Sequence, residues 1–110
     1  MIRHFTDDLQ ELNALLLKMS NLTEEAIDLS IQALKDLNVH LAQEIIANDT
    51  RIDEMEIEIE EKAIDILALH QPLAKDLRFV TTALHINANL ERIADLAVKF
   101  ISCAICSYPK

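Results

Sequence analysis

Hydrophobic and small residues recur along the chain at alternating intervals of four and three, and this spacing predicts three long helices. The first helix is expected over residues 6–37, the second over 41–69 and the third over 72–106. Such intervals place successive side chains on one helix face, so each series forms the inward seam of a helical bundle. The first seam consists of Phe5, Leu9, Leu12, Leu16, Met19, Thr23, Ala26, Ser30, Ala33 and Leu37.

The other two helices carry seams of the same kind. The second seam consists of Leu41, Ile45, Ile52, Met55, Ile59, Ala63 and Ile66, and the third of Leu73, Leu77, Val80, Leu84, Ala94, Val98, Ile101 and Ile105. A further stripe of Leu15, Leu22 and Leu29 lies beside the first seam and indicates contact with two neighbouring helices or with a further domain. Because no strand pattern or linker interrupts the chain, the sequence predicts a single all-α domain over residues 1–110.

Two short breaks define how the helices connect. The segment Asn38-Val39-His40 is expected to end the first helix, because Asn tolerates left-handed backbone. Pro72 suits the first position of the third helix. The tight His70-Gln71 link makes the second and third helices antiparallel neighbours. The predicted fold is therefore an antiparallel, up-down-up three-helix bundle of the spectrin-like type.

Composition narrows the chemistry that such a bundle can perform. The 110 residues include no Gly and two Pro, and 51% of them are hydrophobic, which is enough for a buried core. Without Gly the chain cannot build a Walker loop, a dinucleotide-binding fingerprint or a nucleophile elbow. The formal net charge of -9 repels nucleic acid, anionic lipid and free phosphate, and favours cations and basic protein partners.

The termini give expectations about location. Charged residues occur early, so no secretory signal is expected. The most apolar stretch, residues 97–108, contains Lys99 and is too short to span a membrane. Cys103 and Cys106 are expected to be reduced core or seam residues, since a single CxxC supplies only half of a zinc site.

Two acid-x-x-x-Asp motifs, Asp49/Asp53 and Glu91/Asp95, interrupt the seams of the second and third helices. Residues four apart lie on one helix face, so each motif directs two carboxylates the same way. A turn centred between residues 70 and 71 would place Asp49 almost opposite Glu91, with the other pairs offset by only a few Å at about 1.5 Å per residue. Four such carboxylates repel one another unless they are protonated, paired or bound to cations. The motifs therefore predict a metal site, and oxygen ligands suit Mg, Ca, Mn or ferric iron, while zinc also accepts them.

The alternative interpretation of these motifs is a solvated acidic ridge. On the second helix the acidic stripe continues to Glu56 and Glu60, and Arg51 and Arg92 are available to balance the charge. Acidic residues four apart are common on exposed helices, so spacing by itself does not separate a ridge from a metal site.

No catalytic constellation is found, and the chain is not expected to be an enzyme. A di-iron oxidase requires Glu-x-x-His on two helices, and no histidine here has an acidic residue three positions before it. His85 is level with Glu56, and a hydrogen bond between the two is expected. No Ser/His/Asp or Cys/His arrangement is found at helical spacing. An oxidase or hydrolase that uses the carboxylates is the weaker alternative, because it lacks histidine ligands.

Several segments in order closely resemble the PhoU family of phosphate-uptake regulators. They are the motif DTRID at residues 49–53, QPLAKDLR at 71–78 and ERIAD at 91–95. The segment LNALLLKMSNLTEEAIDLSIQAL at residues 12–34 also looks like the opening helix of that family. The resemblance covers nearly the whole chain.

The resemblance implies a PhoU-like three-helix fold and a specific regulatory role. The family's acid-x-x-x-Asp motifs bind multinuclear clusters of iron or zinc, and by position that role would fall to Asp49, Asp53, Glu91 and Asp95. The resemblance also implies a peripheral cytoplasmic protein that negatively regulates phosphate uptake. Its expected partners are the ATPase of a Pst-type phosphate transporter and a PhoR-type sensor kinase.

The chain departs from the family in holding one repeat of a bundle that usually occurs twice. It is expected to be a truncated half, a fragment, or a single-repeat relative that forms a homodimer to restore the pair. The stripe Leu15/Leu22/Leu29 and the apolar tail Ile101, Cys103 and Ile105 are candidates for the second surface. A metal-free helical interaction or oligomerisation module is the alternative function.

Overall fold

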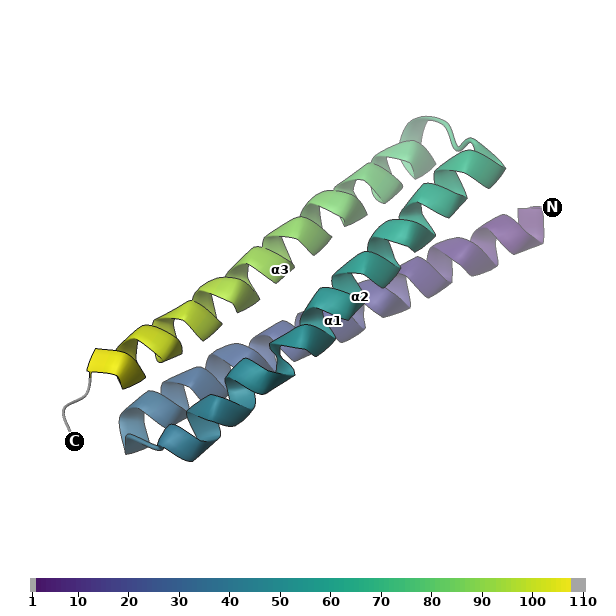
Figure 1. The fold of residues 1–110 in the computed structure, drawn as a ribbon. Coiled ribbons are helices and arrows are strands. Elements are labelled where there is room, and N and C mark those ends of the chain that lie inside the picture. The colour runs from purple at the N-terminus through teal and green to yellow at the C-terminus, as the bar shows by residue number, and fades with distance from the viewer. Residues whose placement is uncertain (1, 108–110) are drawn as a thin grey trace.

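The computed structural model describes residues 2–107, and side-chain positions over residues 4–104. It contains three helices, α1 (Ile2–Asp36), α2 (Val39–His70) and α3 (Ala74–Ser107), and no strand in the described part of the chain. The helices run up, down and up along a rod of 61 × 17 × 17 Å, and each packs against both others (Figure 1). The predicted all-α three-helix bundle is confirmed.

The turn between α1 and α2 differs from the predicted one. Leu37, and not Asn38, takes the left-handed conformation, with φ of 52°. The backbone N–H of Asn38 donates to the carbonyl of Ala33 at 2.9 Å, and that of Leu37 donates to Leu34 at 3.3 Å, which is the Schellman pattern. The Asn38 side chain then caps α2 by accepting from the N–H of Leu41 at 3.0 Å. The cap starts α2 at residue 39, so the break is shorter than predicted.

The turn between α2 and α3 is longer than predicted. The helix α2 ends at His70, and it is capped by Gln71, whose backbone is left-handed and whose N–H donates to the carbonyl of Leu67 at 3.2 Å. Pro72 is buried and lies two residues before α3, so the prediction that it occupies the first helical position is wrong. The reason is the backbone, since Ala74 at the beginning of α3 is left-handed, with a φ of 52°, so the turn extends past Pro72.

The seam of α1 is buried almost as predicted. Its central positions from Leu12 to Ala33 are each at most 9% exposed, and Phe5 and Leu9 pack against them. The seam includes two buried polar residues, Thr23 and Ser30. The Thr23 hydroxyl donates to the carbonyl of Met19 at 2.9 Å, so the hydroxyl group of Thr23 is hydrogen-bonded although it is buried.

Several predicted seam positions are exposed instead. Leu37 is exposed because α1 has already ended, and Leu73 because it lies in the turn before α3. Leu77 is 40% exposed at the edge of the core. Conversely, Ala42 and Ala83 were not predicted seam positions and are at most 1% exposed. Ile105, another predicted seam residue, lies outside the residues whose side chains the structure describes.

The stripe beside the α1 seam serves the bundle itself. Leu15 and Leu22 are half-buried against the main core, and Leu29 against a smaller cluster that contains Ile45 and Ile101. Of the two interpretations of this stripe, contact with two neighbouring helices agrees with the structure. The stripe is thus not a free second surface.

The core is divided into two clusters along the length of the rod. The larger cluster includes Leu12 of α1, Ile52 of α2 and Ala94 of α3. The smaller cluster includes Ala33, Ile45 and Val98. On α2 the seam has no apolar residue between Ile45 and Ile52, because Asn48 and Asp49 occupy that turn. The first acidic motif therefore begins where the core of α2 is interrupted.

A polar clamp fixes the beginning of α1 to the end of α2. Lys62 Nζ lies 3.1 Å from Asp8 Oδ1 and 2.9 Å from Glu11 Oε2, and His70 Nε2 lies 2.9 Å from Asp8 Oδ2. The hydrogen bonds from His70 and Lys62 lower the pKa of Asp8, and the bond to Glu11 is the main cause that raises the pKa of Lys62. The ring of Phe5 lies on His70, with centroids 5.0 Å apart.

The structure bears on the predictions about membrane spans and about the two cysteines. Among the described residues, no helix is long and apolar enough to cross a membrane. Cys103 is a free thiol, but it is exposed, so its predicted place in the core or seam is wrong. The Cys106 side chain lies outside the described residues.

The core position of Ile59 gives a direct test of the packing. Ile59 is fully buried, whereas Ile57 on the same helix is 53% exposed. We expect Ile59→Ala to lower the free energy of unfolding by about 2–5 kcal/mol, because it removes buried methyl groups and leaves a cavity. Ile57→Ala should cost less than about 1 kcal/mol. Urea unfolding followed by circular dichroism measures both, and equal losses would contradict the assigned core.

Candidate metal site on the α2–α3 face

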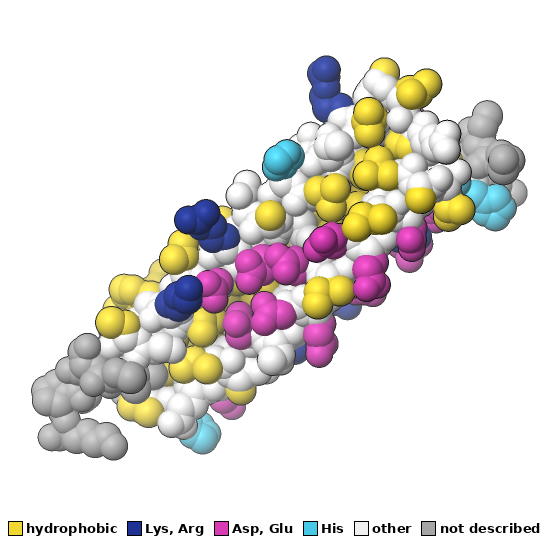
Figure 2. Space-filling view, turned by 45° about the horizontal axis from the view of Figure 1, so that its top comes forward, with side chains coloured by type: hydrophobic (Ala, Val, Ile, Leu, Met, Phe, Trp, Pro, Cys, Tyr) yellow, Lys and Arg dark blue, Asp and Glu magenta, His cyan; other side chains and the backbone are white. Residues whose placement is uncertain are grey.

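A band of carboxylates crosses the face that α2 and α3 form together. Figure 2 shows it as a contiguous group of acidic side chains near the middle of the rod. The band comprises Asp49, Asp53, Glu56 and Glu60 of α2 and Glu91 and Asp95 of α3. The four predicted site residues are therefore all on one face, as the helix spacing required.

The register of α3 against α2 places the two motifs at the same height. The turn is centred on Pro72, one to two residues later than predicted. Asp49 and Asp95 are equally far from Pro72 in sequence, as are Asp53 and Glu91, so these are the opposed pairs. The prediction that Asp49 lies most directly opposite Glu91 is thus corrected by about one helical turn.

A buried hydrogen bond fixes this register beside the carboxylates. Asn87 of α3 is 3% exposed, and its Nδ2 donates to the backbone carbonyl of Glu56 on α2 at 3.0 Å. The Asn87 Oδ1 is buried without a partner among the described residues. Because burying an amide without a hydrogen bond is costly, the bond to Glu56 holds the two helices at one relative height.

Burial, and then repulsion within the band, raises the pKa of three of its carboxyl groups. Partial burial raises the pKa of Asp49, and the charges of Asp53 and Asp95 raise it further. Partial burial also raises the pKa of Glu91, followed by the charges of Asp95, Asp53 and Asp49. Each motif therefore feels the charges of the other across the helix interface.

Glu56 lies in the acidic band beside the four predicted site residues. Burial raises the pKa of Glu56, and the charges of Glu91, Glu60 and Asp53 raise it further. Glu56 and Glu60 line a shallow hollow with Leu84, Asn87 and Ala88 of α3. The sequence contained the signal for both residues, since they continue the acidic stripe of α2 at intervals of three and four.

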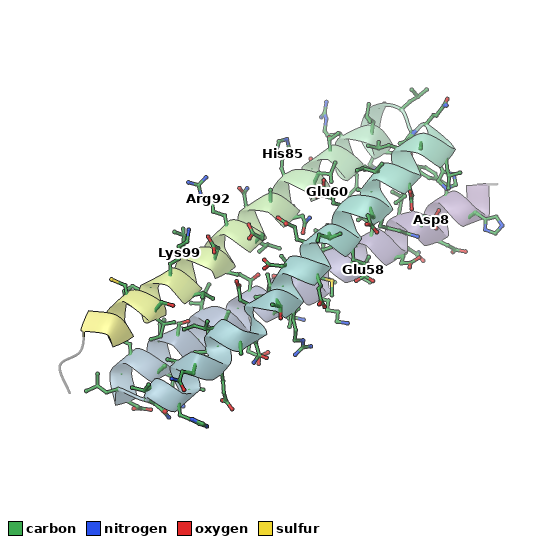
Figure 3. The ribbon with its side chains drawn as sticks, in the orientation of Figure 1. Asp8, Glu58, Glu60, His85, Arg92 and Lys99 are labelled. Atoms are coloured by element: carbon green, nitrogen blue, oxygen red, sulfur yellow. The ribbon has the colours of Figure 1, made fainter. Side chains whose placement is uncertain are left out.

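The cations expected to balance the band do not do so. Neither Arg51 nor Arg92 forms an ion pair within the described residues, and Arg92 projects away from the bundle (Figure 3). The partner is Lys99, whose Nζ lies 3.1 Å from Asp95 Oδ2 one turn away. The predicted hydrogen bond from His85 to Glu56 is also absent, because His85 is exposed on the outer side of α3 (Figure 3).

The carboxylate oxygens of the band suit hard cations, although the carboxyl groups do not converge on one point. All six side chains of the band offer oxygen, and their mutual repulsion makes positive charge favourable there. In the part of the chain that the structure describes, no three Asp, Glu, His or Cys side chains converge on one point as ligands of a metal ion. The residues therefore fit a cation by chemistry and by register, and rotation of their side chains would have to complete the coordination.

The raised pKa values predict an unusual pH dependence. Because Asp49 and Glu91 bind protons more tightly in the folded state than in the unfolded state, their contribution to stability falls as pH rises above about 4. Asp8 has a lowered pKa and behaves in the opposite way, losing its contribution below about pH 4. The two effects thus occupy different pH windows.

We expect the double variant Asp49→Asn, Glu91→Gln to raise the melting temperature by a few degrees at pH 7 in the presence of a chelator. The gain should shrink towards pH 4, where the native carboxyls are protonated. Thermal unfolding of both proteins between pH 4 and 7 measures the difference. A gain that does not change with pH would show that repulsion is not its cause.

Comparison with known proteins extends this description. A family model described as the PhoU domain matches residues 16–104. A phosphate-specific transport system accessory protein PhoU homolog of Zymomonas mobilis is 44% identical over 96 residues, which cover 87% of this chain and 40% of the relative. Homologues of the same description from Aquifex aeolicus and Thermotoga maritima are 41% and 39% identical, and the matches cover 44% and 40% of those relatives. The chain thus spans less than half the length of these relatives.

Proposed function

Because the chain belongs to the PhoU family, we propose that it is a regulatory domain that acts on phosphate transport. The observation that carries the proposal is the family match over residues 16–104, together with relatives about 40% identical that are described as accessory proteins of phosphate-specific transport systems. The match also confirms the resemblance first drawn from DTRID, QPLAKDLR and ERIAD. The proposed role is a regulatory one and includes no catalysis.

The finer part of the proposal concerns direction and partners. The domain lowers phosphate uptake by contacting the ATPase of a Pst-type transporter and a PhoR-type sensor kinase at the cytoplasmic side of the membrane. The family resemblance supports these partners. The net charge of -9 supports contact with basic surfaces on them, because opposite charges accelerate association.

Deleting the coding sequence in its own organism should raise phosphate uptake when phosphate is plentiful. The native gene should restore repression. Uptake of radioactive phosphate measures the effect, with an unrelated transport activity as control. Unchanged uptake in the deletion strain would argue against a regulatory role.

We further propose that the acidic band binds metal ions through Asp49, Asp53, Glu91 and Asp95, with Glu56 as an additional ligand. Iron or zinc is supported by the family resemblance, and Mg, Ca or Mn by the oxygen donors. A bound cation would supply positive charge between α2 and α3 and would thereby relieve the repulsion that, after burial, raises the pKa of Asp49, Glu56 and Glu91. The site would then stabilise the helix pair as well as hold the ion.

Metal binding has a test with a closely matched control. We expect Mn, Zn or ferric iron to raise the melting temperature of the native chain, and Asp49→Asn, Glu91→Gln to abolish the increase. Glu54 and Glu58 are a second acidic pair four residues apart on α2, and both are exposed outside the band. Glu54→Gln, Glu58→Gln removes the same charge and should leave the increase intact.

Elemental analysis of the native protein completes the metal test. If purified protein carries no metal and no added ion changes its melting temperature, metal binding is wrong, whereas regulation of uptake is tested separately by the deletion strain. If both double variants lose the response equally, the ions bind the general negative charge rather than this site.

A metal-free helical interaction module is the second candidate function. It is favoured by the observation that no three ligands converge within the described residues, and by large apolar side chains that remain exposed on every helix. In that case the acidic band serves solubility, and a chelator changes neither the stability nor the association of the chain. Light scattering with and without chelator separates the two candidates.

A further inference from the structure

A hollow between α2 and α3 is polar on one side and aliphatic on the other. Its lining residues are Glu56, Glu60 and Ile64 of α2 and Leu84, Asn87 and Ala88 of α3. Its volume is about 330 Å³, whereas one water molecule occupies roughly 30 Å³ of liquid. The hollow is therefore large enough to take a side chain, and it offers that side chain both negative charge and apolar surface.

One hydrogen-bond acceptor of the hollow is buried and has no donor. Asn87 is 3% exposed, and its Nδ2 is used in the hydrogen bond to the Glu56 carbonyl at 3.0 Å. Its Oδ1 has no hydrogen-bond partner among the described residues. Because buried amide oxygens are nearly always hydrogen-bonded, this oxygen favours an occupant that brings an N–H donor into the hollow.

The cations of the chain do not neutralise the two carboxylates. Within residues 4–104, neither Glu56 nor Glu60 forms an ion pair. Lys62, two residues beyond Glu60, contacts Asp8 and Glu11 of α1 instead. The hollow is therefore open to a cation from another molecule.

The aliphatic side of the hollow favours an arginine side chain over a metal ion. A hard cation binds oxygen ligands and gains nothing from Ile64 or Leu84. Arginine carries a chain of methylene groups that lies on apolar surface while its charge reaches the carboxylates. Its planar guanidinium has five N–H donors and can serve two carboxylates and an amide oxygen together, whereas the ammonium of lysine has three.

The surface around the hollow indicates which residues accompany that arginine. Ile57 and Ile64 are 53% and 52% exposed, and Glu60 lies between them on the same face of α2 (Figure 3). Hydrophobic side chains also border the acidic group on the side of the α2–α3 turn (Figure 2). An amphipathic helix with apolar residues one turn from its arginine fits this surface.

We propose that the hollow binds an arginine side chain on an amphipathic helix of a partner protein. The guanidinium donates to the carboxylates of Glu56 and Glu60 and to Asn87 Oδ1, and apolar side chains of the partner lie on Ile57 and Ile64. Hydrogen bonds between charged groups are about twice as strong as neutral ones. The proposal rests on the proposed contact with basic partner surfaces and names the group that is recognised.

A peptide with a single arginine tests the site. The probe is a fluorescent, glutamine-rich helical peptide with one arginine and a leucine one turn away on each side, in buffer that contains a chelator. We expect the citrulline analogue to bind the native chain about tenfold more weakly, because it keeps the shape of arginine without the charge. The lysine analogue should also bind more weakly. Fluorescence polarisation measures the three affinities.

Two charge-matched variants locate the binding. Glu56→Gln, Glu60→Gln should weaken binding of the arginine peptide about tenfold, because it removes both charged acceptors. Glu54→Gln, Glu58→Gln removes the same charge from exposed positions of α2 and should change the affinity less than about twofold. Circular dichroism should show that both variants remain helical.

A neutral variant tests the shape of the hollow. Ala88→Leu places extra methyl groups in the hollow without changing the charge, so it should also weaken binding of the arginine peptide. The control is Ala14→Leu, at an exposed position of α1, which should bind as the native chain does.

Four results would overturn the arginine site. If the citrulline peptide binds as tightly, the face takes an apolar helix, and if the lysine peptide does, the site does not select the guanidinium. If both double variants lose affinity equally, the peptide binds the general negative charge. If no peptide binds, while Mn²⁺ stabilises the native chain but not Glu56→Gln, Glu60→Gln, the hollow holds a metal ion. Regulation of phosphate uptake is tested separately by the deletion strain.

Discussion

The position of α3 relative to α2 governs the rest of this structure. The turn centred on Pro72 and the buried hydrogen bond from Asn87 to the Glu56 carbonyl set one height for the two helices. At that height the two acidic motifs are opposed, and burial together with their mutual charge raises the pKa of Asp49 and Glu91. A shift by one turn would leave one directly opposed pair of carboxylates in place of two.

The bundle tolerates this repulsion because other interactions hold the helices together along its length. Two apolar clusters lie on either side of the interruption in the α2 seam, and the Asp8–Lys62–His70 clamp closes the end nearest the turn. The acidic motif of α2 begins at Asp49, in the turn where the α2 seam lacks an apolar residue.

The two flanks of α3 differ in the chemical character of their exposed side chains. The flank towards α2 carries the acidic band, which attracts cations and basic surfaces. The flank towards α1 carries Phe79, Ile86, Ile93 and Phe100, which are exposed. The chain belongs to the PhoU family, and the homologue of Zymomonas mobilis is more than twice as long as this chain.

The sequence by itself determined the three helices, most of the α1 seam and the shared face of the acidic motifs, because these follow from helical periodicity within one segment. Tertiary structure decided what depends on the turns. Left-handed backbone at Leu37 and Ala74 exposed Leu37 and Leu73, and the later turn paired Asp49 with Asp95. The exposure of Phe79, Ile86, Ile93 and Phe100 was likewise decided by the tertiary structure. Periodicity shows which residues share a helix face but not whether another helix covers that face.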